Sequence, residues 1–353
     1  MAEAVSIIFR IIEPMMFRGA GEFDPFVRGT YSRAITLAMP SPSTVAGTLA
    51  TYCVSELGKP APISGEWFEQ YISILESDII VRGPLIKLNR ELMVEDSLSE
   101  GFLNMEKIRQ KCEQKWKKIA YKPNLLNQLD NYLEKEKFEP NVKVRKNIRV
   151  GVRLQMREGI IMKITKEGFL YSAEYLDYMI DKSKEIEKIF IDIIAEIRGK
   201  IVERLSSARE LPVKFGGEGR IALLSFQQGY KILDEIKKQL WDGQEKHYGL
   251  LALYLATPAL FKGGKEVEEY VKEWTENLNL KFKGIIGEST VLGAGFMISE
   301  KKRKPIYTSL KPGSIIFLEG DFDLQEIYQK TFGEASVLGY GTIIPVPIIP
   351  TTD

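Results

Sequence analysis

One stretch of alternating residues constrains the fold of this chain more than any other feature. Between residues 142 and 157 the even positions are apolar, with Lys146 as the exception, while the odd positions carry five basic residues. These five are Lys143, Arg145, Arg149, Arg153 and Arg157. An alternation of period two over this length predicts an extended strand with one apolar face and one basic face.

Strands and helices alternate through the first two thirds of the chain. A helix over residues 43–57 is predicted because Ser43 or Thr44 can cap its start and Gly58 can end it. A second, shorter helix is predicted over residues 200–209. Runs of β-branched and aromatic residues predict strands over residues 5–12, 77–88, 142–157, 159–166, 169–173, 187–197 and 221–226. Residues 91–139 are polar and helix-prone, which indicates a helical insertion rather than part of a sheet.

The last third of the chain repeats this order in a more compact form. The pattern predicts a strand, a helix, two strands, a helix and a strand, over residues 248–261, 266–276, 282–298, 314–319, 324–332 and 342–349. A glycine turn precedes the last strand each time, FGGEGR in the first part and LGYG in the second. We therefore expect an α+β fold with two ferredoxin-like (RRM-like) βαββαβ domains, each an antiparallel sheet covered on one face.

The length of 353 residues suits two domains better than one core. The expected boundaries are residues 1–228, with the helical insertion at about 91–139, and residues 245–353. The net charge is only +1, so any attraction to nucleic acid must come from local clusters of basic side chains.

The few cysteine and histidine residues narrow the chemistry that the chain can perform. Cys53 and Cys112 lie far apart and in no CxxC pair, which argues against a disulfide scaffold and favours a reducing compartment. With His247 as the single histidine, a His/Cys zinc site and imidazole acid–base catalysis both lack partners. No apolar run approaches the roughly 20 residues that cross a bilayer. We expect a cytoplasmic protein without a metal, a cofactor, a catalytic residue or a membrane partner.

Four pieces of sequence resemble a known family when they are taken in order. They are EPMMFRGAGEFDPF with PSPSTVAGTLATYC, RVGVRLQMREGI with GFLYSAEYL, FGGEGRIALL, and GAGFMISEKKRKPIYTSLKPGSIIFLEG with VLGYGTIIPVPI. Together the pieces resemble the RAMP proteins of CRISPR effector complexes, most closely the third subunit of the type III-B (Cmr) module. The likeness runs from residue 13 to 348, apart from the predicted insertion.

The resemblance implies two ferredoxin-like domains and no nuclease activity. It implies a subunit of an antiviral ribonucleoprotein that binds the repeat-derived 5′ tag of the CRISPR guide RNA. It also implies contacts with the large polymerase-like subunit and with the backbone RAMP subunit of the Cmr complex.

The glycine turns and the loop over residues 17–29 supply the first candidate RNA contacts. Glycine tolerates positive φ and a close second backbone, so such a turn can direct amides at a phosphate. In the loop, arginine can bind phosphate while aromatic rings stack on unpaired bases. The candidates are Phe17, Arg18, Arg28, Gly216, Gly217, Arg220, Gly339 and Gly341. The structural alternatives are tight helix-to-strand connections, packed phenylalanines and solvated arginines.

Two basic runs and one helix start complete the candidate set. Basic residues on one strand face would repel each other without an acceptor, which favours RNA or an acidic partner over solvent. A helix N-terminus can bind an anion, although simple capping explains its hydroxyl groups equally well. The charged loop before residue 305 contacts RNA or a partner, or is only soluble surface. The residues concerned are Arg145, Arg149 and Arg153, then Ser43 and Thr44, then Lys301, Lys302, Arg303 and Lys304.

Two other functions share the expected fold. One is a RAMP endoribonuclease that processes precursor CRISPR RNA, for which metal-free cleavage that depends on His247 would be the signature. The other is a protein-binding scaffold whose basic strand docks an acidic partner. A crosslink from this chain to guide RNA would argue against the scaffold.

Overall fold

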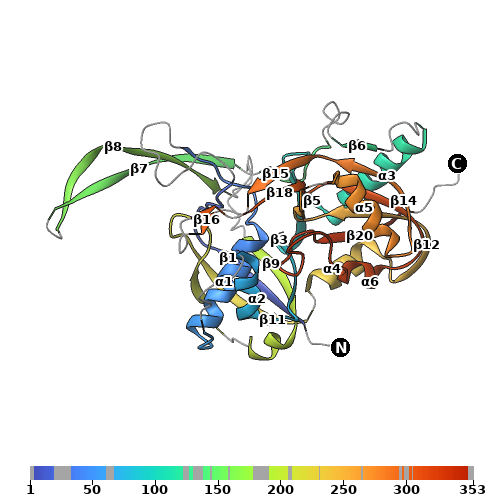
Figure 1. Cartoon of the computed structure of the whole chain (residues 1–353), viewed down its shortest axis with the longest axis horizontal. Coiled ribbons are helices and arrows are strands. Elements are labelled where there is room, and N and C mark those ends of the chain that lie inside the picture. Colours follow the sequence, from blue (N-terminus) through green and yellow to red (C-terminus); the bar gives the residue numbers. More distant parts are fainter. Residues whose placement is uncertain are drawn as a thin grey trace.

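The computed structural model describes most of the chain. The described residues are 4–19, 33–60, 67–121, 127–129, 138–143, 145–157, 160–177, 191–205, 209–229, 231–263, 265–293, 296–297, 302–303 and 305–348. They form a mixed α+β structure with mostly antiparallel sheets, as the sequence predicts (Figure 1).

The first sheet has seven strands. In spatial order these are β10 (Leu211–Lys214), β11 (Ile221–Gln228), β1 (Ala4–Ile11), β9 (Ile191–Arg198), β3 (Ile80–Leu88), β4 (Glu91–Asp96) and β5 (Gly101–Asn104). All neighbours in the sheet are antiparallel. Within the central four strands β11-β1-β9-β3, the chain order is fourth, first, third, second, as a βαββαβ unit gives.

Helices cover both faces of the first sheet. Successive residues of a strand point to opposite faces, so Ile7 and Ile8 of β1 pack in different clusters. Ile7 packs in the cluster that also holds α1 (Pro42–Ser55) and α2 (Trp67–Leu75), whereas Ile8 packs in the one that holds α4 (Lys231–Leu240).

The second sheet has five strands and the same central order. These are β20 (Ile343–Ile348), β12 (Lys246–Leu255), β19 (Ile315–Asp323), β14 (Lys281–Gly287) and β6 (Asn127–Leu129). The first four are antiparallel, and β6 adds in parallel from the first part of the chain.

Helices lie on both faces of the second sheet as well. Trp116 of α3 (Met105–Tyr121) packs on Phe317, with 5.4 Å between the ring centroids. Lys272 of α5 (Val267–Glu276) lies over Phe282, which pairs with Leu318. Because Phe317 and Leu318 are successive strand residues, α3 and α5 cover opposite faces. The short helix α6 (Leu324–Gln329) follows β19.

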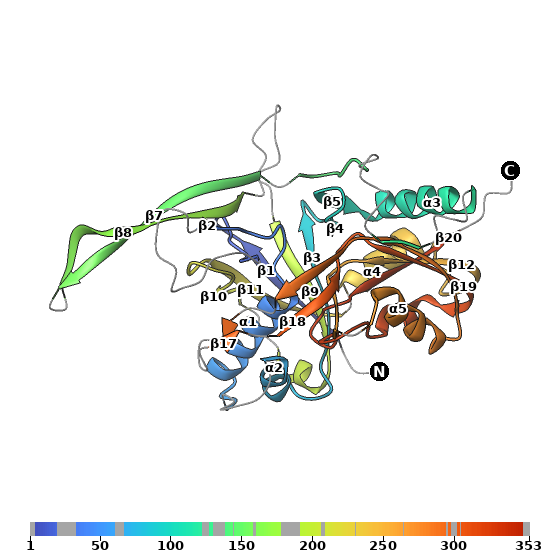
Figure 2. The same ribbon diagram turned by 45° about the horizontal axis from the view of Figure 1, so that its top comes forward.

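Two smaller sheets and one hairpin complete the described structure. They are the sheet β13 (Ala259–Phe261), β18 (Ile306–Leu310) and β15 (Ser289–Gly293), the hairpin β16 (Phe296–Met297) and β17 (Lys302–Arg303), and the sheet β2 (Arg33–Ala34), β8 (Ile160–Asp177) and β7 (Arg145–Arg157). Strands β7 and β8 form a long antiparallel ribbon that projects from the body of the molecule (Figures 1 and 2).

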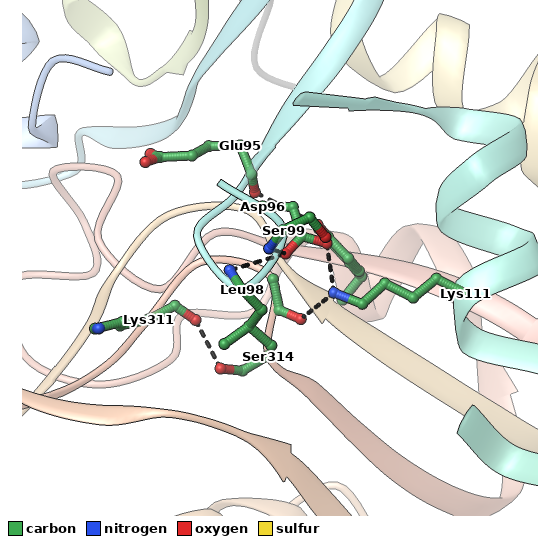
Figure 3. Close-up of polar contacts among 9 residues, drawn as sticks. Glu95, Asp96, Leu98, Ser99, Lys111, Lys311 and Ser314 are labelled. Carbon is green, nitrogen blue, oxygen red and sulfur yellow. Dashed lines mark hydrogen bonds and ion pairs between the residues drawn. The ribbon is translucent and has the colours of Figure 1, made fainter. Parts of the chain in front are cut away.

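Buried charges join the two large sheets. The Asp96 carboxylate accepts hydrogen bonds from the Leu98 and Ser99 N–H groups and from the Lys111 ammonium of α3. The same ammonium donates to the Gly313 carbonyl, 3.1 Å away, between β18 and β19. Figure 3 shows that Glu95, although adjacent in sequence, points away from this pair. An ion pair with both side chains at most 3% exposed thus connects β4, α3 and the turn before β19.

Several expectations about the elements are wrong. Residues 91–139 are not simply a helical insertion, because β4 and β5 extend the first sheet and α3 is the one helix among the described residues of this range. Each sheet is covered on two faces rather than one. The helix expected over 200–209 is a single 3-10 turn, Lys200–Arg204, and the strands expected at 159–166 and 169–173 are one strand, β8. Helices α2 and α4, and strands β10 and β18, are not in the prediction.

The described residues contain neither a membrane-spanning helix nor a metal-binding cluster. No helix among them is long and apolar enough to span a bilayer. Within the same part of the chain, no group of three histidine, cysteine or acidic residues is arranged to hold a metal ion.

Candidate nucleic-acid interface

The FGGEGR turn, residues 215–220, is built against the segment after β1. Gly216 has φ +85°, and a Cβ atom there would lie 2.5 Å from the Met16 carbonyl oxygen. The Gly217 N–H donates to that carbonyl over 2.8 Å, while the Phe215 N–H donates to the Arg220 carbonyl. Only glycine fits at position 216. The contact with Met16 fixes the turn in place.

Arg220, at the end of this turn, is held by a carboxylate and an aromatic ring. Its Nη1 donates to Glu13 Oε2 over 2.6 Å, and its guanidinium carbon lies 4.5 Å from the Tyr175 ring centroid. Burial raises the pKa of Glu13, but the hydrogen bonds from the Ile221 N–H and from Arg220 outweigh it and leave the pKa below its usual value. Arg220 Nε is buried without a hydrogen-bond partner. Arg220 is thus largely engaged inside the protein.

A second guanidinium contacts the same tyrosine. Arg149 of β7 lies 5.1 Å from the Tyr175 ring centroid, and Arg149 itself is exposed. Cation–π contact of this kind orients a guanidinium without neutralising its charge. Arg18 contacts the same turn, where its Nη2 is 3.6 Å from Glu218 Oε1, and its side chain is 47% exposed. The structure therefore brings Arg18, Arg149 and Arg220 together around one turn.

The ribbon has the two faces that its alternation predicts. Arg145 and Arg149 are exposed on one face, opposite Asp177 and Ala173 of β8. On the other face, Ile148 and Val150 are 58% and 70% exposed. The apolar face is thus not buried at these positions.

Glu174 of β8 contacts the lysine that interrupts the alternation of β7. Its Oε2 lies 3.7 Å from Lys146 Nζ. Because Lys146 is at an even position and Glu174 pairs in register with Ile148, this ion pair lies on the apolar face of the ribbon and does not offset the charge of Arg145 and Arg149 on the other face.

The prediction that Phe17 and the LGYG turn lie on the surface as RNA contacts is wrong, because both are buried. Phe17 is 2% exposed and packs edge-on against Phe215, 5.5 Å between centroids. Gly339 and Gly341 are buried, and their N–H groups donate to the Ser336 and Pro258 carbonyls. These residues serve the core, because the LGYG turn passes between the two large sheets.

Ser43 and Thr44 lie at the start of α1, but Ser41 occupies the N-cap position. Ser41 Oγ is 2.9 Å from Ser43 Oγ and 3.0 Å from Thr44 Oγ1. The buried Tyr340 hydroxyl donates to Ser43 Oγ over 3.2 Å. The hydroxyl groups therefore tie the helix start to the LGYG turn. The N-cap residue makes no side-chain capping hydrogen bond, so the cap predicted at Ser43 or Thr44 is wrong.

The remaining candidates fall partly or wholly outside the described residues. Arg28, Lys301 and Lys304 lie outside them. Lys302 and Arg303 form β17 and Arg153 lies within β7, but the structure describes only the backbone there.

Sequence reasoning missed Glu13 and Tyr175, which fix the orientation of the arginines. Glu13 lies in the motif EPMM and Tyr175 in the motif SAEYL, yet neither motif indicates that the two residues contact the same arginine. Their contact depends on the bridge between Met15 and Leu176, in which each N–H donates to the other's carbonyl. Only a prediction that the segments around Met15 and Leu176 pair with each other could have revealed this contact.

Comparison with known proteins gives one family. The family described as CRISPR-associated protein (Cas_Cmr3) matches residues 94–347. The CRISPR system CMR subunit Cmr3 of Saccharolobus solfataricus is 26% identical over 358 residues, which cover 96% of this chain and 95% of that protein.

Solved structures give a similar result for the fold. A chain of the Type III-B Cmr-beta complex bound to cognate target RNA has a TM-score of 0.56 and 21% identity, with 96% of both chains covered. A chain of the same complex bound to cognate target RNA and AMPPnP has a TM-score of 0.54 and 20% identity, with 88% of this chain and 86% of that chain covered. Since the family match extends over most of its length, the chain belongs to the Cmr3 family of CRISPR-associated proteins.

Proposed function

We propose that this chain is a non-catalytic, RNA-binding subunit of a type III-B CRISPR effector complex. In this role it binds the 5′ tag of the guide RNA and docks the large polymerase-like subunit and the backbone RAMP subunit. The family match supports the first statement, and related chains occur in structures of Cmr-beta bound to target RNA.

The proposal includes two ferredoxin-like domains, residues 1–228 and 245–353. The order of the four central strands in each large sheet supports it. Helix α4 then occupies the connection, and its apolar residues pack between the two domains. The first domain carries the arginines around the FGGEGR turn and the projecting ribbon.

The surface around the FGGEGR turn is the proposed site for the tag. Arg18 and Arg149 are exposed beside it, and Arg145 is exposed further along β7. Guanidinium groups bind phosphate in a bidentate manner. A line of such cations can track the phosphate backbone of a single strand. The observation that carries the proposal is the convergence of Arg149 and Arg220 on Tyr175 beside this turn.

Arg18→Ala and Arg149→Ala test the site through the salt dependence of RNA affinity. Each lost phosphate contact lowers the log–log slope of affinity against salt by about 0.7 for single-stranded RNA. We expect each variant to lower that slope by about this amount, and to weaken binding of a tag oligonucleotide by about fivefold at low salt. Electrophoretic mobility or anisotropy titrations at several salt concentrations measure both quantities.

Lys117→Ala, an exposed lysine of α3, is the matched control and should leave the slope unchanged. Equal effects from all three variants would mean that RNA attraction is diffuse and would remove the assigned site.

Incubation of the purified chain with repeat RNA in the absence of metal addresses the enzyme alternative. Specific cleavage that His247→Ala abolishes would replace the proposal with a processing endoribonuclease.

A further inference from the structure

Arg149 differs from the other two arginines around the FGGEGR turn in its partners. Arg18 and Arg220 each lie beside a glutamate. Within the described part of the chain, the guanidinium of Arg149 contacts the Tyr175 ring and no carboxylate. A cation–π contact leaves the charge of a guanidinium unneutralised. Arg149, which is exposed, therefore keeps its charge and its N–H donors for a phosphate.

Tyr175, in contrast, is fixed inside the protein. It is 6% exposed and forms a buried cluster with Met16 and Ala173. The guanidinium of Arg220 also lies over the ring, 4.5 Å from its centroid, and is itself held by Glu13. The ring is thus a rigid support for the longer and more mobile side chain of Arg149.

Arg220 completes this support and is poorly placed to bind RNA itself. Its side chain is 19% exposed, and its Nη1 already donates to Glu13. Its Nε is buried without an acceptor, which costs stability. The fold keeps this unfavourable donor at the position where the guanidinium contacts both Glu13 and Tyr175.

We propose that Tyr175 is a positioning residue for the RNA site and that it acts through Arg149. This inference rests on the proposed function and deepens it, because it separates the residue that binds phosphate from the residues that hold it in place. An arginine side chain loses rotamer freedom when it binds a phosphate. Contact with the Tyr175 ring restricts Arg149 before RNA arrives, so less freedom is lost on binding.

The salt dependence of tag binding distinguishes positioning from direct contact. In Tyr175→Leu, Arg149 can still reach its phosphate in the complex, so the number of phosphate contacts and the log–log slope should stay unchanged. The affinity should fall by about threefold at every salt concentration, as loss of an exposed cation–π contact gives. Arg149→Ala should instead lower the slope by about 0.7. Tyr175→Phe keeps the ring and should retain the wild-type affinity and slope.

Double variants test whether Tyr175 acts through Arg149. Tyr175→Leu should have no further effect on affinity in a chain that carries Arg149→Ala, because the guanidinium that it positions is absent. In a chain that carries Arg18→Ala, the threefold loss should remain in full. Anisotropy titrations of a tag oligonucleotide with the single and double variants measure both quantities. Equal losses in the two backgrounds would show a general effect on the fold and overturn the proposal.

A thermal unfolding scan verifies that each chain is folded at the assay temperature. If Tyr175→Leu is not folded, Tyr175→Met replaces it, since methionine fills the buried site without a ring. Unchanged affinity in the folded variant, with a normal effect of Arg149→Ala, overturns the positioning role alone. If Arg149→Ala itself changes neither affinity nor slope, the RNA site of the proposed function is wrong, and the role of Tyr175 is overturned with it.

Discussion

The Glu196 carboxylate lies where β9 meets α4 and α6, and it is 2% exposed. Its Oε1 accepts hydrogen bonds from the Ile232 and Leu233 N–H groups at the start of α4, over 2.5 and 2.9 Å. Its Oε2 accepts from the Tyr328 hydroxyl over 2.9 Å. Burial raises the pKa of Glu196 to about 7, and the three hydrogen bonds only partly offset this effect. A single side chain thus links the first sheet to both α4 and α6.

This raised pKa predicts a specific pH dependence of stability. The folded chain holds the Glu196 proton up to about pH 7, whereas the unfolded chain releases it near the ordinary value of 4.5. The folded state therefore binds more protons between these values, so the free energy of unfolding falls as pH rises, by on the order of 3 kcal/mol. In Glu196→Gln the amide oxygen can still accept from both N–H groups, and nothing titrates.

Thermal unfolding of both proteins at pH 5 and pH 8 measures this difference. We expect the midpoint of the wild-type chain to fall more between these values than that of Glu196→Gln. Burial also raises the pKa of Glu95 to about 7, so the variant should keep part of the slope. Equal slopes in the two proteins would contradict the assignment to Glu196.

At the scale of elements, sequence patterns found the alternating strand β7 and also β1 and β9, which are buried on both faces and rich in β-branched residues, but they missed β4. The ribbon strand β7 alternates visibly, and its two faces were predicted correctly. Strand β4 does not alternate, because Leu92, Met93 and Val94 are all buried, so its pattern resembles that of a helix. Helix α4, in contrast, carries apolar residues at helical spacing, at 232, 233, 236 and 240, and could have been predicted.

The candidate site was predictable in part for the same physical reason. Basic residues such as Arg18 and Arg149 are visible in the sequence as local positive charge. The roles of Glu13 and Tyr175 depend on pairing between segments distant in the chain, which no local pattern encodes. Glycine identifies a tight turn but does not distinguish the exposed FGGEGR turn from the buried LGYG turn.

Two glycines of the FGGEGR turn give a matched test of this element. Gly216 and Gly219 both have positive φ, but a Cβ atom would collide with the Met16 carbonyl only at Gly216. Alanine at either position costs about 1–2 kcal/mol for the left-handed backbone. We expect Gly216→Ala to cost more than Gly219→Ala in urea unfolding, and to reduce tag binding because the turn must shift. If the two variants unfold at the same urea concentration, the contact with Met16 does not fix the turn.

At the scale of the whole molecule, the described packing joins the two large sheets into one core. The cluster around α4 includes Ile8 and Ile194 of the first sheet and Leu251 of the second. Arg82 of β3 is buried, and its guanidinium donates to the Tyr328 and Lys330 carbonyls at the end of α6. Contacts of this kind fix the two large sheets relative to each other.

The buried pair between Asp96 and Lys111 should be essential to this joint. Lys111→Met keeps the length of the side chain but leaves the Asp96 carboxylate buried without its cation. Removing one partner of a buried ion pair costs about 3–5 kcal/mol. We therefore expect a large drop in the unfolding midpoint, and a broader transition as the two sheets unfold less cooperatively.

The double variant Asp96→Asn with Lys111→Met separates lost charge pairing from lost packing. The asparagine oxygen can still accept from the Leu98 and Ser99 N–H groups, so the double variant should recover part of the stability lost in Lys111→Met. Lys117→Met on the exposed side of the same helix should change the midpoint by less than about 0.5 kcal/mol in free energy. Calorimetry of the four proteins measures both the midpoints and the number of transitions. If Lys111→Met unfolds like Lys117→Met, the joint depends on the apolar contacts around α4 alone, and the ion pair only sets the register of the turn before β19.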